Sequence, residues 1–172
     1  MGIKAGEIVG DEKLNIIREL NKAFADEWLA YYQYWLGAKV IRGPFKDTIG
    51  PELAKHAGEE EGHANRLADR IIILGGTPLI TPKAWFDETN CGFNPPEDDY
   101  VLELVRDNLK GERCAIEHYK KLADKVKDID PVTWHIIIQI LEDETGHEED
   151  LQRFEEDLRL LATRAQSFKK DK

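Results

Sequence analysis

The tetrapeptides EEGH at residues 60–63 and ETGH at residues 144–147 are the most informative part of this sequence, because each places a glutamate and a histidine three residues apart. Three residues of an α-helix turn about 300°, so the two side chains of such a pair lie one turn apart on the same face. A lone glutamate precedes each pair, Glu27 by 33 residues and Glu112 by 32. Each half of the chain therefore carries one glutamate followed by one Glu-x-x-His pair.

Four stretches of the chain carry apolar residues at alternating spacings of three and four, which is the pattern of an amphipathic helix. We expect these helices at about residues 11–41, 51–75, 97–127 and 131–161. Asp11 and Asp130 are suited to N-caps, and Pro51 and Pro131 to first turns. The glutamates and histidines of the repeated pattern interrupt the apolar stripes at positions where an apolar residue is expected.

The two halves of the chain repeat, and a long connection joins them. Tyr34 and Tyr119 are 85 residues apart, and each follows the lone glutamate of its half by seven. Residues 76–96 contain several prolines, and a connection of this length can run the whole length of a bundle. Two helical hairpins joined in this way predict an all-α fold, a ferritin-like four-helix bundle with one long crossover, as a single domain over 1–172 with a frayed tail at 162–172.

The six interrupting side chains predict a site for two metal ions. Buried carboxylates must be neutralised, paired or bound to metal, so the competing interpretations are a buried ion-pair network or a misjudged helix phase. Two Glu-x-x-His pairs, each with its own preceding glutamate, favour metal. Four carboxylates balance two divalent cations, and mostly oxygen ligands with one nitrogen per ion suit iron or manganese better than zinc. We expect Glu60 and Glu144 to bridge the ions, Glu27 and Glu112 to be terminal ligands, and His63 and His147 to bind one ion each.

Several segments resemble the ferritin-like di-iron superfamily, and within it the bacterioferritin type of ferroxidase centre. They are EWLAY at 27–31, EEGH at 60–63, ERCAI at 112–116 and ETGH at 144–147, one on each expected helix. The resemblance implies two iron ions per chain, with manganese as the alternative. It also implies that Tyr34 or Tyr119 orients a ligand or donates an electron. The alternative for both tyrosines is ordinary core packing with a satisfied hydroxyl.

This sequence departs from bacterioferritins in ways that predict a different relative. Bacterioferritins bind haem through a methionine where this chain has Glu61, and Met1 is the only methionine, so we expect no haem. The chain ends about ten residues after the fourth expected helix, which leaves no room for the fifth helix of larger ferritins. Both points favour a smaller Dps-like cage, a dodecamer by that resemblance.

Cys91 and Cys114 also resemble a family feature, the cysteine pair that Dps-like thioferritins carry near the di-iron site. The resemblance implies a disulfide or a redox-active dithiol, and two independent thiols are the alternative. Because residue i+2 of a helix points about 200° away from residue i, Cys114 is not expected to share a metal with Glu112. We expect His56 to be an exposed helix residue, although it lies one turn before Glu60, and His118 and His135 to lie at the surface.

Composition and charge exclude several classes of protein. The 172 residues carry a formal net charge of −10, which argues against DNA as an obligatory partner. No apolar run is long enough to span a bilayer, and the N-terminus does not resemble a secretory signal, so we expect a cytoplasmic protein without a membrane partner.

The sequence thus predicts an iron-storage ferroxidase that oxidises Fe(II) with hydrogen peroxide or dioxygen and protects against oxidative stress. A non-storing di-metal peroxidase or catalase is one alternative. A DNA-compacting Dps-like protein is another.

Overall fold

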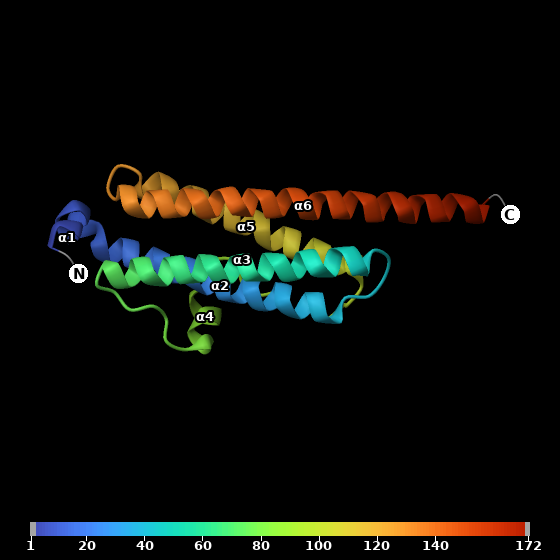
Figure 1. Ribbon diagram of the computed structural model, residues 1–172, viewed down its shortest axis with the longest axis horizontal. Coiled ribbons are helices and arrows are strands. Elements are labelled where there is room, and N and C mark those ends of the chain that lie inside the picture. The colour runs from blue at the N-terminus through green and yellow to red at the C-terminus, as the bar shows by residue number, and fades with distance from the viewer. Residues whose placement is uncertain (1–2, 171–172) are drawn as a thin grey trace.

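The computed structural model describes residues 3–170. In chain order its helices are α1 (Ile3–Val9), the 3-10 helix η1 (Gly10–Glu12), α2 (Lys13–Val40), α3 (Lys46–Ile73), α4 (Pro82–Glu88), α5 (Val101–Val126) and α6 (Pro131–Lys170). The four long helices α2, α3, α5 and α6 form a bundle (Figure 1), in which α2 pairs with α3 and α5 pairs with α6. The predicted four-helix bundle with one long crossover is confirmed. No helix within residues 3–170 is long and apolar enough to cross a membrane.

The crossover carries the chain back along the bundle, as its length predicts. Helix α3 ends where α2 begins, and the crossover passes α4, which packs against α2, before α5 starts at the opposite end (Figure 1). The start of α5 is fixed beside the α2–α3 turn by two backbone hydrogen bonds. The Arg42 N–H donates to the Asp99 carbonyl, and the Val101 N–H donates to the Arg42 carbonyl, both at 2.8 Å.

Two predicted helix beginnings are wrong. Asp11 lies inside η1 and is not the N-cap of α2, because the chain enters α2 directly from that 3-10 turn. Helix α3 begins at Lys46, after the left-handed Phe45, so Pro51 lies inside the helix and not in its first turn. A proline inside a helix removes one backbone hydrogen bond and its ring crowds the carbonyl four residues earlier, so the rest of α3 must offset this cost.

The ends of the other helices also differ from the expected ones. Helix α5 begins at Val101 instead of 97, because Tyr100 is extended and forms a bridge with Arg42, to which Asp99 and Val101 are hydrogen-bonded. Asp130 is confirmed as the cap of α6, since its carboxylate accepts the N–H groups of Val132 and Thr133 at 3.2 and 3.0 Å. The tail expected to fray from 162 stays helical as far as Lys170, and good helix formers such as alanine, leucine and arginine explain this continuation. Residues 171–172 lie outside the described part of the chain.

The buried apolar side chains form two clusters that occupy opposite ends of the bundle. One cluster includes Leu20, Leu67, Leu122 and Ile137. The other includes Leu53, Val105, Leu109, Leu151 and Leu158. Along each long helix the charged residues of the repeated pattern fall between the two clusters, so the candidate site is enclosed by core on both sides.

Candidate metal centre

The six side chains predicted from the repeated pattern meet in the middle of the bundle. All are between 1% and 4% exposed. Helix α2 provides Glu27, α3 provides Glu60 and His63, α5 provides Glu112, and α6 provides Glu144 and His147. The helix phase read from the sequence was therefore right for all six. Their role as metal ligands stays a prediction.

The six residues form two overlapping groups that could each hold a metal ion. One group is Glu27, Glu60, His63 and Glu144, and the other is Glu60, Glu112, Glu144 and His147. In each group one potential ligand atom per residue lies within 4.8 Å of the others. The two glutamates shared by both groups are the two expected to bridge, and the two found in one group each are those expected to be terminal.

Distances around the imidazoles show the same division. Nδ1 of His63 lies 3.2 Å from Glu27 Oε2, 3.1 Å from Glu60 Oε2 and 3.0 Å from Glu144 Oε1. Nδ1 of His147 lies 3.2 Å from Glu60 Oε1, 3.6 Å from Glu144 Oε2 and 3.8 Å from Glu112 Oε1. Each bridging candidate thus presents one oxygen to each histidine.

Unsatisfied polar atoms at the centre fit metal binding. Oε1 of Glu60, Oε1 of Glu144 and Nδ1 of His147 are buried, and within residues 3–170 no hydrogen bond of good geometry reaches any of these atoms. Buried polar groups without partners are rare in folded proteins and each requires an explanation. A pair of divalent cations would satisfy these atoms and balance the four carboxylates, so the residues present fit two metal ions.

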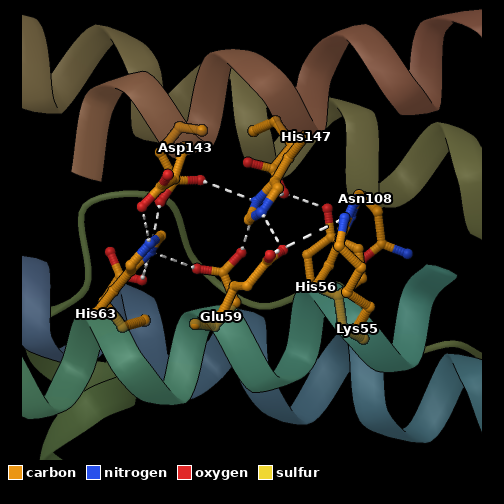
Figure 2. A network of polar contacts seen from close by, with 12 residues as sticks. Lys55, His56, Glu59, His63, Asn108, Asp143 and His147 are labelled. Carbon is orange, nitrogen blue, oxygen red and sulfur yellow. Dashed lines mark hydrogen bonds and ion pairs between the residues drawn. The ribbon is translucent and has the colours of Figure 1, made fainter. Parts of the chain in front are cut away.

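Two acidic residues that the sequence analysis missed hold the outer nitrogens of the histidines. His63 Nε2 lies 3.1 Å from Asp143 Oδ2, and His147 Nε2 lies 3.0 Å from Glu59 Oε2 (Figure 2). A carboxylate that accepts the outer N–H fixes the tautomer and orientation of a ligating imidazole. The signal was present in the sequence, because these acids directly precede Glu60 and Glu144 at equivalent positions of the repeat.

The two tyrosines donate hydrogen bonds to the outer carboxylates, each across to the opposite helix. The Tyr34 hydroxyl donates to Glu112, and the Tyr119 hydroxyl donates to Glu27. Both side chains are buried, and burial together with the neighbouring carboxylates raises the pKa of each phenol well above its ordinary value. The tyrosines are therefore protonated donors that can position Glu27 and Glu112, and their role toward bound metal stays a prediction.

The protonation of the metal-free centre divides its glutamates into two kinds. Burial and repulsion by Glu60 and Glu144 raise the pKa of Glu27 and of Glu112 well above the ordinary value. Burial also opposes the ionisation of Glu60 and Glu144, but the adjacent imidazoles of His147 and His63 lower the pKa of both. Without metal, the terminal candidates therefore retain a proton more readily than the bridging candidates do.

The histidines carry the compensating charge. Burial opposes a positive charge on His147, but the adjacent carboxylates of Glu144 and Glu60 raise its pKa to about 10. Contacts with Glu144, Glu27 and Glu60 likewise raise the pKa of His63 against the effect of burial. Two imidazolium groups and two carboxylates therefore balance in the buried centre without metal.

Comparison with known proteins identifies the family. Residues 17–161 match the model of the ferritin-like domain. A bacterioferritin of Brucella melitensis is 31% identical over 135 residues, which cover 77% of each chain. A DNA protection during starvation protein of Pyrococcus furiosus is 27% identical over 83% of this chain and 77% of its own length. The chain belongs to the ferritin-like family.

A solved structure is similar to this ferritin-like chain over nearly its whole length. It is that of a dodecameric thioferritin, the bacterioferritin-related protein of Bacteroides fragilis, whose sequence is 37% identical to this chain and whose structure matches with a TM-score of 0.90. The match covers 97% of this chain and 99% of that one. The resemblance to bacterioferritins, Dps proteins and thioferritins read from the sequence is confirmed.

The cysteine pair of this ferritin-like chain is a disulfide, with the Cα atoms of Cys91 and Cys114 5.7 Å apart. Asp26 holds the crossover in place for it, since its carboxylate accepts the N–H groups of Asn90 and Cys91 at 2.8 and 3.0 Å. Cys91 also lines a small cavity of about 40 Å³ that reaches Glu27, Glu60, Glu112 and Glu144. Cys114 belongs to neither metal group, as expected from its helix position.

Two of the three remaining histidine expectations are wrong. His56 is fully buried instead of exposed, because it is enclosed by the rings of Tyr34 and His147 at centroid distances of 5.3 and 4.1 Å. His118 is half-buried beside the disulfide, since the crossover covers this face of α5. His135 is exposed, as expected.

Proposed function

We propose that the protein is a ferroxidase that oxidises Fe(II) with hydrogen peroxide or dioxygen at a di-metal site within one chain and stores the ferric product in a cage of identical chains. Membership of the ferritin-like family supports iron storage and iron oxidation in general. The observation that carries the specific proposal is the pair of four-residue groups that share Glu60 and Glu144.

The arrangement suits two-electron chemistry. Peroxide accepts two electrons, so two Fe(II) ions held side by side can each supply one. Two Fe(II) ions, one hydrogen peroxide and two water molecules give two FeOOH units and four protons. In this proposal Glu60 and Glu144 bridge the ions, Glu27, His63, Glu112 and His147 complete their ligands, and Tyr34 and Tyr119 hold the outer carboxylates. Removing Fe(II) and peroxide together would protect the cell against hydroxyl radicals.

An exposed aromatic cluster supports assembly into a cage. Tyr32 on α2 lies 5.9 Å from Trp35 and 6.1 Å from Phe93 between ring centroids, and Phe86 of α4 lies 5.8 Å from Phe93. Tyr32, Trp35 and Phe86 are 46%, 40% and 57% exposed in the single chain. Exposed apolar clusters of this kind mark protein–protein contacts. We propose that identical chains meet here, in a dodecamer like that of the Bacteroides fragilis thioferritin.

The ferroxidase proposal is tested by removing one shared carboxylate. We expect Glu60→Gln to lower the rate of Fe(II) oxidation by peroxide more than about a hundredfold, because both metal groups lose a charged ligand. The matched control is Glu61→Gln, an exposed neighbour on the same helix. The measurement is the appearance of ferric absorbance after peroxide is added to anaerobic protein with Fe(II). Equal rates in the two variants would contradict the proposal.

The storage part is tested separately by particle mass. After iron and peroxide, purified protein should sediment as a large soluble particle with many more iron atoms than ligand groups. A monomer or dimer that holds about two metals per chain would instead support the non-storing peroxidase or catalase alternative. The net charge of −10 argues against the DNA-compacting alternative, which a gel shift with duplex DNA at modest salt would test.

A further inference from the structure

A histidine and two carboxylates gather beside the candidate metal centre without belonging to it. His56 on α3, Glu52 one turn before it and Asp150 on α6 each offer a ligand atom within 4.8 Å of the others. None of these three residues is among the six of the di-metal site. We propose that Glu52, His56 and Asp150 form a third cation site, which takes a divalent transition metal ion.

The state of His56 is the observation that points to a ligand. Its side chain is fully buried, and neither ring nitrogen has a hydrogen-bond partner in the described part of the chain. A neutral imidazole carries a lone pair on one ring nitrogen, and no donor among residues 3–170 occupies that lone pair in His56. A neutral imidazole with an unused nitrogen is a good ligand for divalent transition metals.

The spacing between the groups suits an ion better than a direct contact. Nε2 of His56 lies 3.6 Å from Glu52 Oε1 and 3.8 Å from Asp150 Oδ2, which is too long for a hydrogen bond. Two ligands that each lie about 2.1 Å from a metal ion are at most about 4.2 Å apart. An ion between these three atoms could therefore reach all of them with small side-chain movements.

The surroundings of the site allow both entry and a fixed geometry. The side chains of Glu52 and Asp150 are 30% and 28% exposed, whereas His56 is stacked against His147 (Figure 2). Lys55 contacts Glu52 at 2.7 Å and Arg153 contacts Asp150, but both basic side chains are more than half exposed and can turn away. An ion held here would lie between solvent and the His147 end of the di-metal centre.

Cobalt titration of the metal-free full-length protein tests the proposal. We expect the wild type to bind about three Co(II) ions per chain and Glu52→Gln/Asp150→Asn to bind about two. The charge-matched control Glu61→Gln/Asp157→Asn changes two exposed acids on the same helices and should still bind about three. A wild type that saturates at about two, or a Glu52→Gln/Asp150→Asn variant that keeps about three, would overturn the third site.

Two further variants separate this site from the di-metal site. His56→Phe keeps an aromatic ring against His147 but removes the nitrogen ligand, so it should also lose one ion. Glu60→Gln/Glu144→Gln disrupts the di-metal site and should retain about one Co(II) that the double variant at Glu52 and Asp150 lacks. If Glu60→Gln/Glu144→Gln still bound about three Co(II) ions, the proposed di-metal centre would fail while this site would stand.

Discussion

Tyr34 on α2 donates its hydroxyl hydrogen to Glu112 on α5, so the outer carboxylate of one half is held by the other half of the chain. Tyr119 on α5 returns the same contact to Glu27 on α2. Because each phenol is seven residues from the glutamate of its own half, it lies about two turns along its helix and faces the partner helix at the centre. In each half of the repeat, the tyrosine therefore holds the terminal glutamate of the other half.

Removing one of these hydroxyls should loosen one terminal carboxylate. We expect Tyr34→Phe to weaken Co(II) binding at one of the two positions by about tenfold or more, because a group that orients a ligand is worth roughly 10–100-fold in affinity. Tyr119→Phe should do the same at the other position. The control is Tyr31→Phe, a half-buried tyrosine on α2 that packs against Trp28. Unchanged affinities in both variants would show that the hydroxyls only fill the core.

The two carboxylates that contact the outer histidine nitrogens, Asp143 and Glu59, give a second prediction, because each should affect a different metal ion. Asp143→Asn should weaken the ion bound by His63, and Glu59→Gln the ion bound by His147, each by about tenfold to a hundredfold. The reason is that the amide no longer accepts a charge-assisted hydrogen bond from the outer ring nitrogen. Stepwise Co(II) titration resolves the two ions, and exposed Glu142→Gln is the matched control. If each variant weakened both ions equally, the crossed pairing would be wrong.

The helical spacing of apolar residues in the sequence was enough to predict which side chains lie at the centre of the bundle. Glu27, Glu60, His63, Glu112, Glu144 and His147 break apolar stripes, and helix geometry alone places such residues inside the bundle. Glu59 and Asp143 were missed because they lie one residue off the stripe, where a charged residue normally faces solvent. Only the close approach of α3 and α6 turns them toward the histidines of the opposite helix.

Features that depend on contacts between distant segments could not be derived from residue patterns. His56 also lies off the expected ligand positions, and its burial follows from the rings that enclose it. Asp26 reads as an ordinary polar neighbour of Glu27, but the crossover brings Asn90 and Cys91 onto its carboxylate. The disulfide partner of Cys91 likewise depended on how the crossover returns to α5, and the sequence indicated it through a family resemblance alone.

The disulfide should stabilise the fold as well as fix the crossover. It closes a loop of 23 residues, so its loss should lower the free energy of unfolding by roughly 2–4 kcal/mol. We expect this loss in Cys91→Ser/Cys114→Ser and in wild type treated with a strong reductant, measured by guanidinium unfolding. The variant itself should not respond to the reductant. A variant as stable as the oxidised wild type would contradict a stabilising role.

Metal loading should release protons, because protonated side chains balance the charge of the centre when no metal is bound. The pKa values of His63, His147, Glu27 and Glu112 are all raised, so each of these groups holds a proton that a metal ion must displace. Two imidazolium and two carboxylic protons make four, and we expect about four protons per chain when two divalent ions bind.

The sign of the pH dependence follows from the same exchange. Since the free protein binds more protons than the loaded protein, metal affinity should rise with pH and fall steeply toward mildly acidic conditions. Zn(II) added to weakly buffered protein with a pH indicator measures the release, and Glu27→Gln/Glu112→Gln should reduce it to about two, since only the histidine protons remain. Affinity that does not change with pH would mean that none of these four groups holds a proton in the free protein. The charge balance of the buried centre would then require a cation that remains bound throughout purification.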